Sequence, residues 1–256
     1  MRKIRFPALC LALLLVLSLC AGCSYRAGGG PLIRMRGEHT VIKAEDAAPG
    51  GAYDFSVRRL IFASAQEATI TVKPADGAPR VEVDCAKSFV DAGLTVAIGD
   101  GKIAVSTDNG GTFTTDTFHI TVYAPCKSIL IEGAYKLDAD ASGVDDFSLE
   151  VDGAADGQVY NLDAGRVKCD IRGAAKLSLS GKAQQLDCTI DGTAALDAKA
   201  LSVSDAGVTI NGAGRATVNA ANSLDAAING AGSIVYYGSP ASVKPRINGA
   251  GSIQPG

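Results

Sequence analysis

The sequence predicts an all-β protein whose folded part is a right-handed parallel β-helix, or β-solenoid, with about 19–20 residues per coil. Three observations predict the β-solenoid, and the twist preference of parallel crossover connections favours the right-handed form. A short phrase recurs seven times in the second half of the chain, apolar and polar residues alternate over many segments, and amphipathic helices are lacking. The composition agrees, because 30 of the 256 residues are glycine and only 5% are aromatic, which favours thin repetitive packing over a bulky core.

The repeated phrase has an apolar residue, a polar residue and then a glycine, as in "INGAGSI", which starts at Ile228 and again at Ile247. The apolar residues that begin the seven phrases are Ile131, Val151, Ile171, Ile190, Ile210, Ile228 and Ile247. They are separated by 20, 20, 19, 20, 18 and 19 residues. Such a constant period is the signature of a solenoid, in which each coil buries its apolar side against its neighbours.

The positions around these apolar anchors predict the direction of the side chains. The residue two before each anchor and the residue six after it are almost always apolar, whereas the residue directly after it is polar. Strand alternation places the first two sets inward and the third outward. The glycine of each phrase permits a sharp corner with positive φ. The polar set Asn211, Asn229 and Asn248 is predicted to form a stacked amide ladder.

Residues 40–126 are predicted to be an irregular, strand-rich part of the same domain, and residues 127–256 its regular coils. Period-two alternation predicts strands at Ala68–Pro74, Arg80–Cys85, Leu94–Ile98, Lys102–Thr107 and Phe118–Pro125. Glycine- and aspartate-rich turns separate them, and Ser88–Leu94 is the one short candidate helix. A β-sandwich followed by a shorter solenoid is the alternative organisation.

Residues 1–22 are predicted to be a lipoprotein signal peptide. Three cations, Arg2, Lys3 and Arg5, precede the apolar run Ala8–Leu19, which has signal-peptide length and is short for a membrane span. The following "LCAGCS" resembles a bacterial lipobox, which implies cleavage before Cys23 and attachment of lipid to it. Ordinary secretory cleavage nearby is the alternative. Residues 23–39 are predicted to be a flexible tether.

The charge balance and the lipid together predict partners and location. Loss of the three signal-peptide cations moves the formal net charge from −3 to −6, and an acidic surface disfavours nucleic acid. The expected partners are the membrane, through the N-terminal lipid, and an unknown protein or glycan. Two or three acyl chains would anchor the protein stably to the cell envelope, periplasmic or surface-facing. Ser24 favours the outer membrane if the cell is Gram-negative.

The phrase "INGAGSI" and the stretch "GSIVYYGSPASVKPRINGAGSI" resemble the head GIN domain family of auto-transporter adhesins. The stretch "EATITVKPADGAPRVEVDC" is also similar to the opening of that family. The resemblance spans roughly Asp54 to Ile253. It implies a right-handed parallel β-helix that is secreted or lipid-anchored, and it supplies no catalytic residues.

Residues with catalytic or metal-binding chemistry are few. His39 and His119 lie far apart in sequence, so both are interpreted as solvated surface side chains rather than a triad or zinc site. The aspartates between Leu137 and Asp170 match no calcium motif and are interpreted as a solvated acidic face. Cys169 and Cys188 share an inward column and are interpreted as buried thiols, with a disulfide as the alternative.

The sequence therefore predicts a non-catalytic cell-envelope lipoprotein, an adhesin or a binding or structural module, without cofactor or metal. The alternative is a carbohydrate-active β-helix enzyme, which would require a deep groove with paired carboxylates. Tyr236 and Tyr237 are candidate partner-binding residues, although they could instead cover the end of the core. Oxidation of a pair formed by Cys85 and Cys126 is left open by the sequence.

Overall fold

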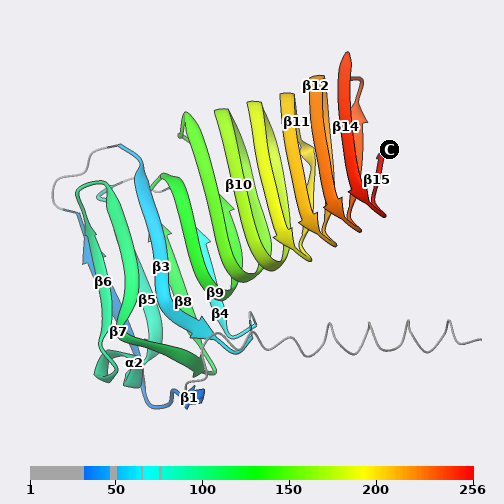
Figure 1. Ribbon diagram of the computed structural model, residues 1–256. Helices are drawn as coiled ribbons and strands as arrows, with labels where there is room; N and C mark the ends of the chain where they lie inside the picture. Colours follow the sequence, from blue (N-terminus) through cyan, green and yellow to red (C-terminus); the bar gives the residue numbers. More distant parts are fainter. Residues whose placement is uncertain (1–31, 47–50, 65, 75–76) are drawn as a thin grey trace, which may run out of the picture.

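The computed structural model describes residues 32–46, 51–64, 66–74 and 77–256, and the predicted signal peptide and Cys23 lie outside them. The described chain forms a β-solenoid of about six turns, which confirms the predicted fold class (Figure 1). The coils run along the molecule from the aromatic-rich N-terminal part to the last strands of the chain. None of the helices in the described ranges has the length and apolarity needed to cross a bilayer.

Fifteen strands and one short helix, α2 (Ser88–Asp91), make up the described fold. The strands are β1 (Leu32–Arg34), β2 (His39–Glu45), β3 (Tyr53–Phe62), β4 (Ala68–Val72), β5 (Arg80–Ala86), β6 (Leu94–Gly99), β7 (Lys102–Thr114), β8 (Phe118–Tyr123), β9 (Cys126–Asp140), β10 (Asp146–Gly192), β11 (Ala195–Gly212), β12 (Arg215–Gly230), β13 (Ser233–Gly238), β14 (Ser242–Gly249) and β15 (Ser252–Pro255). The five strands predicted between residues 68 and 125 correspond to β4–β8, and the predicted short helix to α2.

The repeated phrases lie in register on successive coils. Ile190 pairs with Ile210 in a parallel ladder, and Ile210 pairs in turn with Ile228. The first six anchors are at most 1% exposed, so they form the aliphatic interior that the sequence predicts. The seventh differs: Ile247 pairs with Ile228 on one side and is 48% exposed. Pro245, predicted to point inward, is exposed in the same coil.

The glycine of each phrase forms a corner of the coil. All seven have φ between +121° and +141°, a conformation that side chains with a Cβ rarely adopt. At Gly192 an added Cβ would lie 2.3 Å from the carbonyl oxygen of Gly173 in the preceding coil. That carbonyl accepts a hydrogen bond from the Thr193 N–H, so it is held in place. The corner therefore requires glycine for both its backbone conformation and its close stacking.

The N-terminal part continues the solenoid in an order that differs from the chain order. β3 and β4 both pair in parallel with β9, and on their other side they pair in parallel with β7 and β8. Antiparallel pairing is confined to β2 with β5, β5 with β8, and β6 with β7, among the described strands. The residues of β3 and β4 thus lie about 50 positions before their partners in β7 and β8.

Aromatic side chains close the N-terminal end of the core. Phe62 contacts the rings of Phe89, Phe113, Phe118 and Tyr135, with centroids 4.9–6.4 Å apart. The Tyr135 hydroxyl donates a 2.7 Å hydrogen bond to the carbonyl oxygen of Leu60. Burial, with a smaller contribution from the charge of Glu132, raises the pKa of Tyr135 well above its ordinary value. This cluster packs an end that the aliphatic columns alone would leave open.

Part of the predicted tether is folded. Leu32–Arg34 form β1, which pairs in parallel with Thr112–Thr114 of β7, and β2 begins at His39. The three residues of β1 do not alternate between apolar and polar, so the sequence pattern does not predict this strand. The predicted tether of residues 23–39 is therefore too long at its C-terminal end.

The four cysteines of the described chain, Cys85, Cys126, Cys169 and Cys188, are buried free thiols. This agrees with the interpretation of Cys169 and Cys188 as small apolar groups. Burial, and then the charge of a neighbouring aspartate, raises the pKa of Cys85 to about 11 and that of Cys126 to about 12. The pKa of Cys188 is also raised well above its ordinary value, through its hydrogen bond with Cys169 and its burial.

These thiols are expected to resist alkylation in the folded protein. N-ethylmaleimide at pH 8, followed by peptide mass spectrometry, should label Cys85 and Cys126 more than about tenfold more slowly than an exposed Ser242→Cys reporter. The folded protein also keeps these two thiols protonated to a higher pH than the unfolded chain does. The resulting contribution to the free energy of unfolding is fully present below the ordinary pKa of 9.0 and is lost as the pH rises through about 11 for Cys85 and about 12 for Cys126. Labelling of the native thiols as fast as the reporter would contradict the buried positions.

Candidate functional site

A groove of about 840 Å³ lies on one face of the solenoid and crosses several coils. It begins at Thr69 and Thr71 of β4 and extends to Arg215 and Thr217 of β12. Its floor is formed where apolar residues such as Leu177 turn inward and are buried. The residues on either side of each buried position turn outward, because side chains alternate along a strand. Strand parity therefore produces two parallel rows of side chains along the groove.

The two rows are in register from coil to coil. Lys136 pairs with Asp156, and Ala195 pairs with both Lys176 and Arg215. We name the two sets the lysine row and the aspartate row. The lysine row consists of Lys136, Asp156, Lys176, Ala195 and Arg215, and the aspartate row of Asp138, Gln158, Ser178, Asp197 and Thr217. Neighbouring members are separated by about 4.8 Å, the spacing of adjacent strands.

The groove carries balanced charge and free hydrogen-bonding groups. It has three cations and three carboxylates among its lining residues. Within the described chain, Lys136, Lys176 and Arg215 take part in none of the ion pairs. Gln158 Nε2 donates a 2.8 Å hydrogen bond to Asp138 Oδ1, which orders the aspartate row. The cationic groups are thus available to a ligand.

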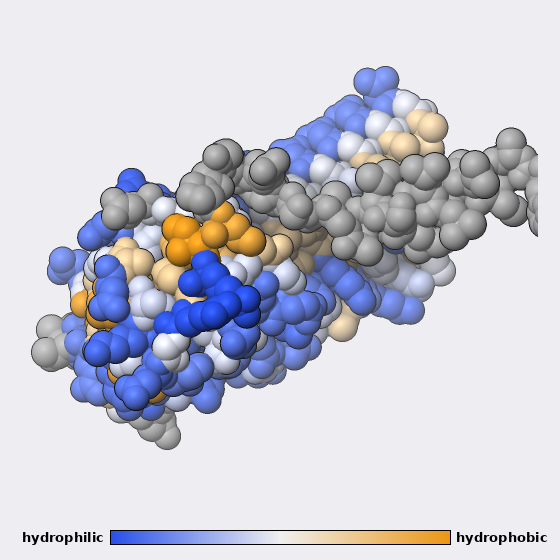
Figure 2. All heavy atoms as spheres, turned by 90° about the horizontal axis from the view of Figure 1, so that it is seen from below, coloured by the Kyte–Doolittle hydropathy of each residue, from blue (hydrophilic) through white to orange (hydrophobic). Residues whose placement is uncertain are grey.

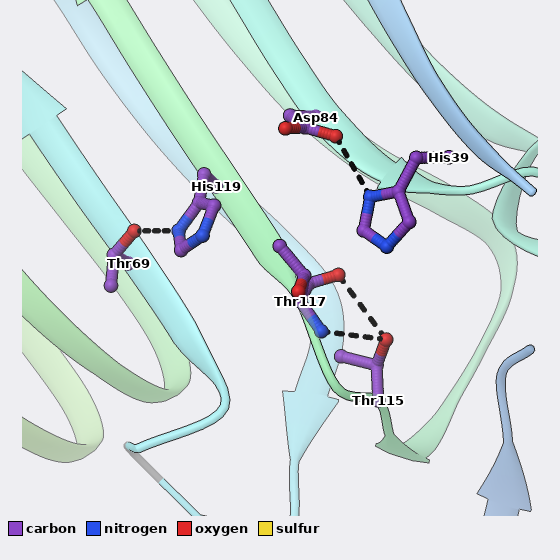
Figure 3. Close-up of polar contacts among 6 residues, drawn as sticks. All are labelled: His39, Thr69, Asp84, Thr115, Thr117 and His119. Carbon is purple, nitrogen blue, oxygen red and sulfur yellow. Dashed lines mark hydrogen bonds and ion pairs between the residues drawn. The ribbon is translucent and has the colours of Figure 1, made fainter.

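The same sheet continues beyond the groove to β8, β5 and β2, where both histidines lie. The imidazole of His119 hydrogen-bonds to the Thr69 hydroxyl, and His39 Nδ1 lies 3.1 Å from Asp84 Oδ1 (Figure 3). Asp84 and His119 are cross-strand partners, but the carboxylate of Asp84 bonds to His39 instead. A Thr–His–Asp relay is therefore not assembled here.

The acidic segment between Leu137 and Asp170 is largely paired. Asp140 accepts hydrogen bonds from the backbone of Ser142 and the amide of Asn161, and Asp163 and Asp170 form ion pairs with Lys182 and Lys168. In the ranges that the structure describes, no three potential ligands are grouped so that they could hold a metal ion.

The predicted amide ladder is present over part of its length. Asn211 Nδ2 donates to Asp191 Oδ1 at 2.6 Å, and Asn229 Nδ2 donates to Asn211 Oδ1 at 2.8 Å. Asn248 continues the register opposite Asn229. This ladder stands on the exposed glycine corner, outside the groove, and ties successive coils together.

Tyr236 and Tyr237 lie in β13, outside the groove. Both are half-buried, and Tyr236 packs against the end of the hydrophobic core. Lys199 Nζ lies 3.9 Å from the centroid of the Tyr237 ring. Tyr236 thus helps to cover the core, as the structural interpretation expects, and partner binding by the two tyrosines stays a prediction.

Sequence reasoning missed the groove residues Lys136, Lys176, Arg215, Gln158 and Asp197. They occupy the positions five and seven residues after each anchor, on either side of the buried residue six after it. The same parity that predicts the inward column could therefore have placed them on one outer face. The lipid-attachment prediction for Cys23 lies outside the described residues.

Comparison with known proteins identifies the class. Residues 64–240, more than half of the chain, match the family described as "Putative auto-transporter adhesin, head GIN domain", and the chain belongs to this family. The resemblance noted from the sequence is thereby confirmed. No curated protein matches the chain.

Several solved structures share the fold. A putative adhesin from Bacteroides fragilis NCTC 9343 is 20% identical, with a TM-score of 0.73 over 87% of this chain and 99% of the other. A putative lipid binding protein from Parabacteroides distasonis ATCC 8503 is 17% identical, with a TM-score of 0.61 over 88% and 100%. A putative adhesin from Parabacteroides merdae ATCC 43184 is 18% identical, with a TM-score of 0.59 over 89% and 100%. At these identities the likeness establishes the fold.

Proposed function

We propose that this chain is a non-catalytic, lipid-anchored module of the cell envelope that binds a linear, hydroxyl-rich glycan along its groove. The observation that carries this proposal is the pair of largely polar rows, which lie in register on neighbouring coils of the solenoid. Adhesion to such a polymer agrees with the family description.

The dimensions of the groove favour an extended polymer over a small molecule. Six strand positions, from Thr69 to Arg215, span roughly 24 Å at the strand spacing. Each strand position presents a carboxylate, amide, hydroxyl or amine. The spacing between neighbouring strands is close to the length of one sugar unit in a linear glycan. Because the cations and carboxylates balance, hydroxyl groups are better partners than a polyanion, which accords with the prediction from net charge that nucleic acid is not a partner.

The exposure of the groove carboxylates supports binding without catalysis. A glycosidase needs one carboxyl group kept protonated by an apolar environment, opposite a second carboxylate. Asp156 and Asp197 are exposed, and Asp138 is half-buried and hydrogen-bonded to Gln158. Release of new reducing ends or unsaturated products from a bound glycan would instead support the carbohydrate-active enzyme.

The anchor and the location are part of the same proposal. The lipobox-like "LCAGCS" supports lipidation of Cys23, and the adhesin family supports a position on the outside of the cell membrane. Globomycin treatment should cause the uncleaved precursor to accumulate, and mass spectrometry should find acyl chains on Cys23. A mature protein that begins at another residue, without lipid, would overturn the anchor.

The groove is tested with a glycan array followed by calorimetry on the best glycan. Lys176→Ala and Asp197→Ala should each weaken binding by about 10- to 100-fold, because each removes a charge-assisted hydrogen bond worth roughly 1.5–3 kcal/mol. Lys244→Ala, an exposed lysine of β14 outside the groove, is the matched control and should leave the affinity unchanged. Binding that survives both groove variants, or an array without a bound glycan, would contradict the proposal.

A further inference from the structure

Exposed apolar side chains gather at the N-terminal end of the described fold. Five large apolar residues of the described chain are strongly exposed, and three of them, Leu32, Ile33 and Val90, belong to β1 and α2. Leu32 is 60%, Ile33 38% and Val90 43% exposed. In Figure 1, β1 and α2 lie near each other at the lower edge of the N-terminal part, and Figure 2, seen from below, shows an apolar patch there beside strongly hydrophilic side chains.

The segment after β1 is joined to α2. The backbone N–H of Arg36 donates a 3.1 Å hydrogen bond to Ser88 Oγ, and the N–H of Lys87 donates to the carbonyl oxygen of Glu38 at 2.9 Å. The exposed apolar residues are therefore carried by two elements fixed to each other. We name the six exposed residues Leu32, Ile33, Arg34, Arg36, Lys87 and Val90 in and beside these two elements the base surface.

The base surface carries three exposed cations. Arg34, Arg36 and Lys87 are exposed, and within the described residues none of the three takes part in the ion pairs. Acidic residues close to these three in sequence or along the nearby turn are Glu38, Asp91 and Asp116. Apolar side chains flanked by arginine and lysine suit the interface of a bilayer, where the apolar groups enter and the cations meet anionic headgroups.

The position of the proposed anchor in the sequence favours a lipid bilayer as the occupant of this surface. In the sequence, eight residues separate Cys23 from Leu32. Even a fully extended chain of that length spans only about 30 Å, at roughly 3.3–3.6 Å per residue. A lipid on Cys23 would therefore hold β1 closer to the bilayer than the distant coils β14 and β15, which lie at the other end of the molecule in Figure 1.

We infer that the base surface rests on the membrane, with Leu32, Ile33 and Val90 in the headgroup region. This inference depends on the lipid anchor of the proposed function. The N-terminal coils then lie at the bilayer, and β14 and β15 lie at the other end of the molecule (Figure 1). The lipid supplies most of the attachment, and the apolar and cationic side chains of the base surface add to it.

The absence of tryptophan from the chain provides a clean probe. Full-length lipidated Leu32→Trp and Val90→Trp proteins are reconstituted in mixed phosphatidylcholine–phosphatidylglycerol vesicles that contain brominated lipid. The fluorescence of both should fall by about twofold or more, since bromine quenches tryptophan at the interface. The matched control is Ile247→Trp, an equally exposed apolar position in β14, whose fluorescence should be unchanged.

The outcomes separate this inference from the anchor. Proteins that fail to float with the vesicles would refute the anchor, whereas Leu32→Trp and Val90→Trp proteins that float without any quenching would refute the base contact alone. Arg34→Glu with Arg36→Glu should reduce the quenching while flotation persists, because the lipid still holds the protein. If the tryptophan fluorescence is not quenched and the protein forms dimers in detergent, the base surface contacts a second copy of the chain, and the membrane contact is refuted.

Discussion

Gly192→Ala is expected to lower the free energy of unfolding by about 4 kcal/mol, or to prevent folding altogether, through backbone strain and steric overlap. Gly192 has φ of +140°, and a Cβ there would lie 2.3 Å from the carbonyl oxygen of Gly173. Removing this steric overlap would require the separation of two coils that are joined by the hydrogen bond from the Thr193 N–H to the Gly173 carbonyl oxygen. Urea titration followed by far-UV circular dichroism measures the change as a shift in the midpoint.

Gly165→Ala is the control for this substitution. Gly165 also lies in β10, but its φ is outside the left-handed region, and an added Cβ would be 3.4 Å from Asp146 Oδ1, an ordinary contact. Its free energy of unfolding should change by less than about 1 kcal/mol. Equal midpoints for the two variants would show that the corner does not depend on glycine.

Ile210→Ala should lower the free energy of unfolding by about 2–5 kcal/mol, the range for removing a large side chain from a packed core. Ile210 is fully buried and lies between Ile190 and Ile228 of the adjacent coils, so the cavity is enclosed above and below. The measurement is the urea midpoint together with the thermal midpoint. Since solenoid coils unfold partly as separate units, hydrogen exchange would locate the weakened coil.

The same substitution at Ile247 supplies a matched control. Ile247 occupies the equivalent position of its coil, but it is 48% exposed. Ile247→Ala should therefore cost about 1 kcal/mol or less. A similar loss at both positions would mean that the aliphatic interior does not distinguish central coils from the last one.

The regular coils could be predicted because their pattern is local and repeated. The spacing of the anchors fixes which residues stack, and the glycine after each polar residue marks the corner, as the positive φ values confirm. The N-terminal coils were only partly predictable. Alternation identifies β4 and β8 as strands, but it contains no information that β3 and β4 insert between β9 and the pair β7 and β8.

The candidate site was less predictable than the fold. Parity places Lys176 and Asp197 on an outer face, yet the groove is lined by residues from five strands, β4, β9, β10, β11 and β12, and no local pattern predicts that they enclose a hollow. Tyr236 and Tyr237 stood out in the sequence because aromatic residues are scarce there, and scarcity is a weak guide to function. In the fold, Tyr236 contributes to covering the core.

The proposed binding of a glycan along the groove gives adhesion by this chain a physical basis. A solenoid repeats one arrangement of side chains at a constant step, and a linear glycan repeats one arrangement of hydroxyl groups. Binding along several coils adds weak contacts without a deep pocket, so affinity should rise with glycan length until the groove is filled. The base surface and the anchor would place this groove beside the membrane and outside it.

Hydrogen–deuterium exchange of the full chain, with and without the glycan selected by the array, tests the central claim most directly. Binding along the groove should slow exchange together in the five segments 136–138, 156–158, 176–178, 195–197 and 215–217, which line it. Slower exchange at Tyr236 and Tyr237 alone, or no change in these five segments at saturating glycan, would contradict a ligand that lies across the coils.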